Sequence, residues 1–215
     1  MKGEGYGMNI IEPSYIIEEK IDGWEVLKKI EQIGRVCYKS EEKITENSAR
    51  IFVEKLIESG HESVIEHEKI TVRLICDRGV SHEIVRHRIA SYSQESTRYC
   101  NYKTDKFGKE LTFIKPYFWV EDKEKFAIWE ETMLFIEKAY MELIQMGANP
   151  QEARSVLPNS IKTEIVVTMN LREWRHFFKL RVSKAAHPQM RQLAVPLLGE
   201  FQRKIPILFD DILVE

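Results

Sequence analysis

Residues 86–99 read RHRIASYSQESTRY, and this stretch combines three arginines with a dense run of hydroxyl and amide side chains. Its apolar content is low, because only Ile89, Ala90 and two tyrosines could contribute to a core. Guanidinium groups bind phosphates and carboxylates through a planar fork of donors. The stretch therefore indicates either a solvated basic helix end, which the helix dipole favours, or a site for an anionic ligand.

The segments around this stretch indicate how the chain presents it. EKITVRLICD (68–77) and KTEIVVTMNL (162–171) alternate apolar and polar residues, which predicts two strands. Residues 80–89 are predicted to form a short helix that carries Arg86, His87 and Arg88 near its end, with a loop over 89–102. On a helix, Arg86 and Arg88 would lie about 200° apart, so we expect them to face two different ligands.

The rest of the chain adds further strands and helices without a regular strand–helix alternation. A broken strand is predicted near Pro13, and helices are predicted at 24–38, 46–59, 122–146, 172–182 and 188–203. This order favours an α+β fold, with a mixed or antiparallel sheet flanked by helices. Since no linker, repeat or low-complexity tract interrupts residues 1–215, we expect a single domain.

Composition restricts the class of protein. The formal net charge is −2 and the hydrophobic fraction is 43%, so the chain can bury a core and is not a general nucleic-acid binder. Neither a signal sequence nor an apolar run of membrane-spanning length is present. Three cysteines without a CxxC pair are typical of reduced thiols. We therefore expect a soluble cytoplasmic protein that binds neither nucleic acid nor a membrane.

The spacing of histidines and cysteines predicts neither a metal site nor a thiol nucleophile. His82 and His87 are five residues apart, and His61 and His67 are six apart, so neither pair matches the four-residue spacing of HExxH. Cys76 is in phase with core residues of its strand, which leaves Cys100 as the only cysteine to consider as reactive. Glycine-rich phosphate loops are absent, so phosphates would be bound by side chains.

A second group of polar residues lies later in the chain. Arg154 precedes a proline in NPQEARSVLP, and TMNLREWRHFFKLR leads from a strand into a helix. In that helix Arg172, His176 and Lys179 fall near one face. Arg181 falls on the apolar side beside Phe177, Phe178 and Leu180, where an arginine needs either a carboxylate partner or an anionic ligand.

These motifs together resemble the flavin-dependent thymidylate synthases. RHR, seven residues and then Ser96 match the family signature, and Arg98 and Tyr99 also fit. GHESVIEH, EARSVLP and NLREWRHFFKLR…AHPQ resemble further segments of the family, in the family's order. The resemblance implies a mixed α/β enzyme that makes dTMP from dUMP without a cysteine nucleophile. It also implies methylenetetrahydrofolate as one-carbon donor, FAD as hydride carrier, NADPH as reductant, and a homotetramer with shared active sites.

The resemblance also implies roles for individual residues. The residues expected to contact FAD are Ser63, Arg86, His87, Arg88, Gln94, Asn170, Leu171, Arg172 and His176. The residues expected to contact dUMP are Glu83, Ile84, Val85, Arg86, Gln94, Glu95, Ser96, Thr97, Arg98, Arg154 and Arg181. Arg181 matches the arginine that polarises the pyrimidine, and His61 and His187 match histidines near the flavin or folate.

The chain departs from the family pattern at four positions. Glu83 stands where relatives often have Gln, and Gln94 stands where many have Glu. Ser93 replaces a common Asn, and Cys37 a small polar residue. Two alternatives stay open: a flavoprotein that methylates a different pyrimidine, and a non-catalytic nucleotide- or RNA-binding module.

Overall fold

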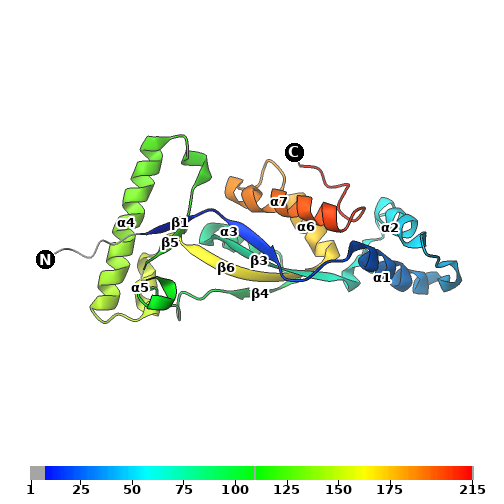
Figure 1. Ribbon diagram of the computed structural model, residues 1–215, viewed down its shortest axis with the longest axis horizontal. Helices are drawn as coiled ribbons and strands as arrows, with labels where there is room; N and C mark the ends of the chain where they lie inside the picture. The colour runs from blue at the N-terminus through cyan, green and yellow to red at the C-terminus, as the bar shows by residue number, and fades with distance from the viewer. Residues whose placement is uncertain (1–7, 109, 215) are drawn as a thin grey trace. The chain divides into compact units, whose positions relative to one another are not determined.

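The structure is a computed structural model that describes residues 8–108 and 110–214 (Figure 1). Its strands are β1 (Asn9–Ile11), β2 (Ser14–Ile17), β3 (Lys69–Asp77), β4 (Ala90–Gln94), β5 (Thr112–Ile114) and β6 (Lys162–Asn170). Its α-helices are α1 (Gly23–Arg35), α2 (Ser48–Glu58), α3 (Arg78–Ile84), α4 (Lys123–Gln145), α5 (Pro150–Ala153), α6 (Leu171–Arg181) and α7 (Pro188–Lys204). Short 3-10 helices are η1 (Val36–Tyr38), η2 (Glu41–Lys43), η3 (Glu62–His67), η4 (Asp105–Phe107), η5 (Tyr117–Trp119) and η6 (Arg154–Val156).

The chain divides into two compact units, and each is assembled from segments that are distant in sequence. Of the described residues, unit 1 contains 8–14, 74–86 and 93–165, and unit 2 contains 15–73, 87–92 and 166–214. In chain order, β3, β4 and β6 each begin in one unit and end in the other. Within the described part of the chain, no helix is long and apolar enough to cross a membrane.

The sheet confirms the strands predicted from alternation. A four-stranded sheet has the order β2-β3-β6-β4, and β1 pairs in parallel with β5. β3 and β6 run antiparallel, because the Leu171 amide donates to the Glu68 carbonyl while the Arg78 amide donates to the Ile161 carbonyl. Every second residue of β3 is buried from Ile70 onward, as the sequence pattern indicated. The predicted α+β fold with a mixed sheet is confirmed.

The region around Arg86 differs from the sequence-based expectation. The helix predicted over 80–89 instead spans Arg78–Ile84, where the Asp77 side chain caps its start by accepting from the Val80 amide at 2.7 Å. Arg86, His87 and Arg88 therefore lie beyond the helix, and the argument from their angular separation on a helix was wrong.

The loop predicted over 89–102 was also wrong in part, because its first half forms β4. Ser91 and Ser93 point outward while the intervening residues are half-buried. The polar composition concealed a strand whose backbone is paired with β6.

An aromatic cluster makes α6 a rigid platform in unit 2. Trp174, Phe177 and Phe178 of α6 are buried and contact Phe201 of α7 and Phe209, with ring centroids 5.1–5.8 Å apart. Such pairs each contribute about 0.5–1.5 kcal/mol beyond the area that they bury. The opposite, polar face of α6 is therefore presented from a well-packed base.

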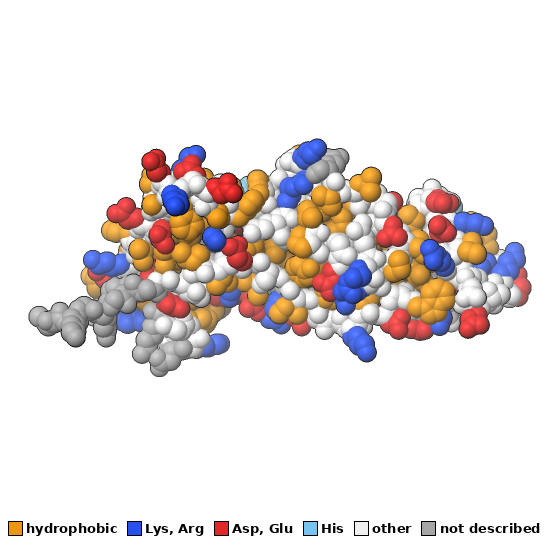
Figure 2. Space-filling view, turned by 45° about the horizontal axis from the view of Figure 1, so that its top comes forward, with side chains coloured by type: hydrophobic (Ala, Val, Ile, Leu, Met, Phe, Trp, Pro, Cys, Tyr) orange, Lys and Arg blue, Asp and Glu red, His pale blue; other side chains and the backbone are white. Residues whose placement is uncertain are grey.

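Unit 1 has its own core beneath α4. Trp129, Met133 and Tyr140 of α4 are buried with Tyr102 and Phe113. On the face drawn in Figure 2, hydrophobic side chains are interspersed with acidic and basic ones, and Lys and Arg do not form a continuous stripe.

Candidate functional site

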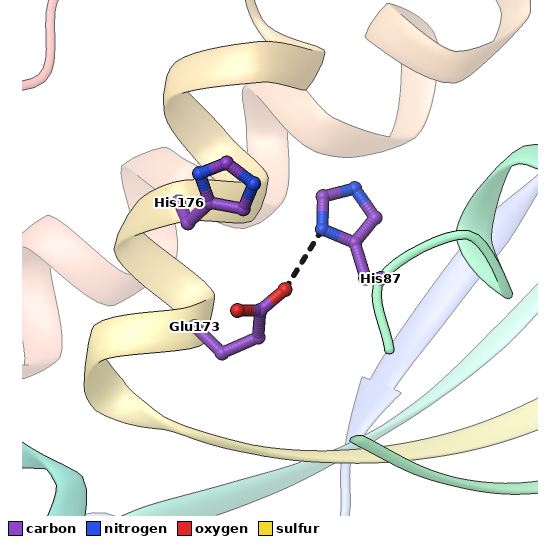
Figure 3. Close-up of side chains that lie close together, drawn as sticks. All are labelled: His87, Glu173 and His176. Carbon is purple, nitrogen blue, oxygen red and sulfur yellow. Dashed lines mark hydrogen bonds and ion pairs between the residues drawn. The ribbon is translucent and has the colours of Figure 1, made fainter. Parts of the chain in front are cut away.

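His87 is the centre of a hydrogen-bonded chain in unit 2. Its Nδ1 lies 3.0 Å from Glu173 Oε1, and the Arg181 Nε–H donates to its Nε2 at 3.1 Å (Figure 3 shows the first of these contacts). A guanidinium can only donate, so Nε2 is unprotonated and the single imidazole proton lies on Nδ1, which donates it to Glu173. His87 is thus a neutral imidazole of defined tautomer.

The surroundings of His87 favour this neutral form. Burial lowers the pKa of His87 below its usual value. The hydrogen bond to Glu173 opposes this shift, and the nearby Arg181 and His176 reinforce it. The main chain is also fixed, since the Tyr92 hydroxyl donates to the His87 carbonyl at 2.5 Å. The ring packs against Phe177 with centroids 5.0 Å apart.

His87, Glu173 and His176 are close enough to be considered as metal ligands. Their potential ligand atoms lie within 4.8 Å of one another, and Figure 3 shows Glu173 and His176 projecting from the same helix. Coordination through His87 Nδ1 would require the proton to move to Nε2, where it would oppose the Arg181 N–H. The arrangement therefore fits a hydrogen-bonded positioning device better than a metal site.

A cavity of about 530 Å³ in unit 2 is lined in part by Glu173, the hydrogen-bond partner of His87. Its lining residues are Glu62, Glu66, Ile89, Asn170, Arg172, Glu173, His176 and Lys179. The sequence-based grouping of Arg172, His176 and Lys179 on one face of the helix is confirmed. The Arg172 guanidinium donates to Glu66 at 2.6 Å, and this hydrogen bond raises the pKa of Arg172.

Asn170 ends β6 and caps α6, and Leu171 is the first residue of α6. Asn170 caps the helix, because its Oδ1 accepts from the Glu173 amide at 2.8 Å, which leaves the amide nitrogen of its side chain for other partners. Leu171 is completely buried, so contact with a ligand requires rearrangement.

A buried arginine supports the floor of this site. Arg175 donates to Glu62 at 3.0 Å, to both carboxylate oxygens of Asp211, and to the Leu208 carbonyl. Burial raises the pKa of the Asp211 carboxyl, but the hydrogen bond and charge of Arg175 outweigh this and hold its pKa below the usual value. Glu62 also lies 3.8 Å from Lys179, so it joins the buried ion pair to the cavity.

Unit 1 contains a different polar group, centred on Gln94. Its Nε2 donates to Ser81 Oγ at 2.9 Å and to Thr163 Oγ1 at 3.1 Å. Ser81 is committed as a donor to the Arg78 carbonyl, so its lone pairs face Gln94 and fix the orientation of the amide. Gln94 Oε1 is thereby assigned as an acceptor.

Glu95 follows Gln94 and is held by two partners. It accepts from the Tyr102 hydroxyl at 2.9 Å and pairs with Lys162 at 2.8 Å.

The arginines expected to bind phosphate lie in the same unit, with long contacts. Arg154 reaches Thr97 Oγ1 at 3.5 Å, and Arg98 reaches the Gln151 side chain at 3.5 Å. Ser96 Oγ accepts from the Arg98 amide at 3.3 Å, which holds the turn closed.

The other predicted site residues are divided between the units. In unit 1, Ile84 is fully buried, whereas Val85 and Arg86 are exposed and Glu83 is half-buried. In unit 2, Arg88, Ser63, His61 and His187 are exposed. Ser63 lies in η3, His61 directly precedes it, and His187 caps α7 by accepting from the Gln189 amide at 3.3 Å.

Sequence reasoning did not identify three carboxylates that organise the unit 2 site. Glu173 bonds His87, Glu62 bonds Arg175, and Glu66 bonds Arg172. The detectable signal was spacing: Glu173 precedes His176 by three residues, and Glu62 precedes Glu66 by four, so each pair could share a helical face.

The cysteines behave as their sequence environment indicated. Cys76 is buried, and burial raises its pKa well above the usual range. Burial, followed by the nearby Glu95, also raises the pKa of Cys100, which disfavours its thiolate. Cys37 is exposed.

Comparison with known proteins assigns the chain to a family. Residues 21–207 match the profile of the family described as "Thy1: Thymidylate synthase complementing protein". A flavin-dependent thymidylate synthase of Pyrococcus furiosus is 38% identical over 172 residues, which cover 80% of this chain and 70% of that protein. One of Geobacter sulfurreducens is 37% identical over 185 residues, covering 83% and 78% respectively.

A solved structure supports the same assignment at the level of the fold. The UMP/dUMP methylase PolB from Streptomyces cacaoi, bound with 5-Br dUMP, superposes with a TM-score of 0.77 and 21% identity. The superposition covers 94% of this chain and 96% of that one. The chain therefore belongs to the family of thymidylate synthase complementing proteins, the flavin-dependent thymidylate synthases.

Proposed function

We propose that the chain catalyses the reductive methylation of dUMP to dTMP. Methylenetetrahydrofolate serves as one-carbon donor, FAD as hydride carrier and NADPH as reductant. The observation that carries the proposal is the arginine of the matched C-terminal segment: the Arg181 Nε–H donates to a neutral His87 at 3.1 Å, which restricts the plane of the guanidinium. An arginine placed in this way suits a substrate that develops negative charge during reaction.

The residues of unit 2 fit FAD by the chemistry of their donors. Arg172 and Lys179 offer cationic donors to a pyrophosphate, and Asn170 and His176 offer polar groups along the same cavity. Ser63, His87, Arg88 and Leu171, with Arg86 and Gln94 of unit 1, complete the proposed FAD set. When bound, FAD supplies the hydride transfer that no side chain can perform.

The chain's own residues supply positioning and charge. Arg181 donates hydrogen bonds to a pyrimidine carbonyl and stabilises negative charge that develops in the ring. His87 holds that guanidinium in place. A cysteine nucleophile is not needed, which agrees with the raised pKa of Cys76 and Cys100 that burial produces.

The residues of unit 1 suit a nucleoside monophosphate. Arg98 and Arg154, together with the Ser96 and Thr97 hydroxyls, offer donors to a phosphate. Gln94 Oε1 is an acceptor, so it suits an N–H group of a base. The remaining proposed dUMP contacts are Glu83, Ile84, Val85, Arg86 and Glu95, while His61 and His187 are proposed to lie near the flavin or folate.

We extend the proposal to assembly and location. The chain acts as a single domain, forms a homotetramer with shared active sites, and works in the cytoplasm. Light scattering on the eluting protein measures the assembly, and a monomer at working concentration would contradict it. Limited proteolysis that released a stable fragment would contradict the single domain.

The decisive experiment is anaerobic incubation with FAD, dUMP, methylenetetrahydrofolate and NADPH, followed by chromatographic analysis for dTMP. We expect dTMP only when all four are present. Omitting each component in turn provides the controls. A folded protein that retains or titrates FAD and yet forms no dTMP would overturn the proposal.

A parallel reaction with UMP tests the closest alternative. The solved relative is described as a methylase of both UMP and dUMP, so the preferred sugar needs a direct measurement. Product from UMP at a rate equal to or above that from dUMP would favour the alternative pyrimidine substrate. A colourless protein that binds nucleotides but cannot titrate FAD would favour the binding module.

A further inference from the structure

We infer that Glu173 is a positioning residue, which orients Arg181 through His87. The inference deepens the proposed function and rests on it for the role of Arg181 in the reaction. Glu173 was not among the residues that the sequence pattern selected, and the His87 imidazole links it to Arg181. The carboxylate–imidazole–guanidinium chain of Glu173, His87 and Arg181 is called the relay below.

The geometry of the relay is set at both imidazole nitrogens. Glu173 Oε1 accepts a hydrogen bond from His87 Nδ1 at 3.0 Å, and Arg181 Nε donates one to His87 Nε2 at 3.1 Å. An imidazole with its proton on Nε2 could not accept from Arg181, and one protonated at both nitrogens could not either. Glu173 is the group that keeps the proton on Nδ1, so it makes Nε2 available to Arg181.

The guanidinium is the member of the relay that gains a fixed orientation. Nε lies in the guanidinium plane, so a hydrogen bond from Nε restricts that plane and the directions of the terminal nitrogens. A planar donor fork binds well only when its plane matches that of the ligand. Loss of the Nε bond would remove this restraint on the plane of the guanidinium, which would then have to be ordered on binding.

The remaining contacts show that the relay is rigid at its base. The Glu173 amide is capped by Asn170 Oδ1, so the backbone that carries the carboxylate is fixed at the start of α6. The His87 backbone is bound by Tyr92, and its ring packs on Phe177. Both Glu173 and His87 are buried, which strengthens their hydrogen bond relative to one in water.

A purely structural role for Glu173 makes a different prediction. A carboxylate that only filled space beside His87 could be replaced by an apolar side chain of similar size without altering the proton position. The test therefore needs a readout of the imidazole tautomer as well as a rate. Three variants supply it: Glu173→Leu, Glu173→Gln, and Glu66→Gln, which serves as a control for the tautomer measurement alone, because Glu66 lines the same cavity but contacts Arg172 and not His87.

The first measurement is nitrogen-15 NMR of the histidine side chains at neutral pH, without ligands, with His87 assigned from a His87→Gln spectrum. We expect the parent and Glu66→Gln to show a protonated Nδ1 and an unprotonated Nε2. Glu173→Leu should populate the Nε2–H tautomer. Glu173→Gln should retain the parent pattern, since its amide oxygen can accept the same hydrogen bond.

The second measurement separates the two half-reactions. We expect Glu173→Leu to reduce the rate of the dUMP-dependent step about tenfold, which corresponds to about 1.4 kcal/mol. NADPH-dependent flavin reduction without dUMP should stay at the parent rate. Glu173→Gln should recover most of the lost rate, and thermal melting confirms that each variant is folded.

The outcomes separate this inference from the function on which it rests. If Glu173→Leu keeps the Nδ1–H tautomer, the relay is wrong whatever the enzyme does. If the tautomer changes while the dUMP-dependent rate is unchanged, Glu173 does not position Arg181 for the reaction. A parent protein that forms no dTMP overturns the proposed function, whereas the relay is still judged from the tautomer alone.

Discussion

The two groups of arginines proposed to meet ligands differ in how tightly the protein already holds them. On α6 in unit 2, Arg172 is bound by Glu66 at 2.6 Å and Arg181 by His87 at 3.1 Å. In unit 1, Arg98 and Arg154 make long hydrogen bonds of 3.5 Å, to Gln151 and Thr97, and the Arg98 guanidinium also lies 5.2 Å from the centre of the Tyr99 ring. The first pair is oriented before any ligand arrives, and the second is held loosely.

This difference has a consequence for binding. A ligand of Arg172 must exchange with a carboxylate, so the net gain is the difference between two charge-assisted hydrogen bonds. A phosphate that binds Arg98 and Arg154 displaces only long hydrogen bonds, so its net binding free energy is close to that of the new charge-assisted hydrogen bonds. We therefore propose that the α6 arginines contribute mainly orientation and that Arg98 and Arg154 contribute mainly affinity for the phosphate of dUMP.

The largest expected effect comes from removing the oriented guanidinium. Arg181→Ala should retain FAD but slow the dUMP-dependent oxidation of reduced flavin by roughly a hundredfold, about 3 kcal/mol of lost transition-state stabilisation. Arg181→Lys should rescue poorly, since an ammonium cannot reproduce a planar two-point contact. Rapid-mixing absorbance measures both half-reactions, and parent rates in both variants would reduce Arg181 to a structural partner of His87.

Removing a loosely held arginine should act on affinity instead of rate. Arg154→Ala is expected to raise the dissociation constant of dUMP about thirtyfold, because a charge-assisted hydrogen bond contributes about 2 kcal/mol. Calorimetric titration measures it, with Arg50→Ala on exposed α2 surface as the control. If Arg154→Ala instead lowers the rate at saturating dUMP, the division between orientation and affinity is wrong.

Releasing Arg172 from its carboxylate should strengthen binding of an anionic cofactor. Both side chains of the pair are substantially exposed, and such pairs contribute about 0.2–1 kcal/mol. Glu66→Gln should therefore tighten FAD binding by up to about fivefold, as measured by fluorescence quenching of the flavin. Glu54→Gln on α2 provides the charge-matched control, and weaker FAD binding by Glu66→Gln would mean that Glu66 itself assists the cofactor.

The smallest expected effect is on stability, through the pH dependence of the His87 contact. The pKa of His87 is lowered in the folded state, so the unfolded chain binds its proton more readily. The contribution is fully present above about pH 6.5, the unfolded value, and is lost as the pH falls toward the folded pKa.

The titratable and charged groups that contact His87 are Glu173, His176, Arg181 and Tyr92. Urea unfolding across this pH range measures the free energy of unfolding. We expect it to fall with decreasing pH in the parent, and to fall less steeply in His87→Gln. An identical slope in the two proteins would show that His87 does not titrate differently on folding.

Sequence reasoning succeeded where periodicity or a shared motif carried the information. The alternation of apolar and polar residues correctly predicted β3 and β6, and the spacing of apolar residues predicted the bounds of α2, α4 and α7 to within a few residues. The grouping of Arg172, His176 and Lys179 followed from helical spacing alone and agrees with the cavity lining.

It failed where tertiary pairing decided the local structure. Residues 90–94 look like a loop because Ser91, Ser93 and Gln94 are polar, but the strand is stabilised by its pairing with β6. Arg181 also contacts His87, 94 residues away, and sequence reasoning did not anticipate this contact. A contact of that sequence separation leaves no periodic trace, so one sequence without an alignment could not identify it.

The buried arginine beneath the cavity also affects how the protein is made. Arg175 lies in the middle of α6, but Asp211, which binds it most fully, follows it by 36 residues. During synthesis the chain emerges from its N-terminal end, so α6 is present while the guanidinium still lacks this partner. A charged group with incomplete pairing is costly to bury, so the packing around Arg175 cannot be completed until Asp211 has been translated. The aromatic face of α6 also waits for Phe201 and Phe209, so in a nascent chain this face stays exposed until both have emerged.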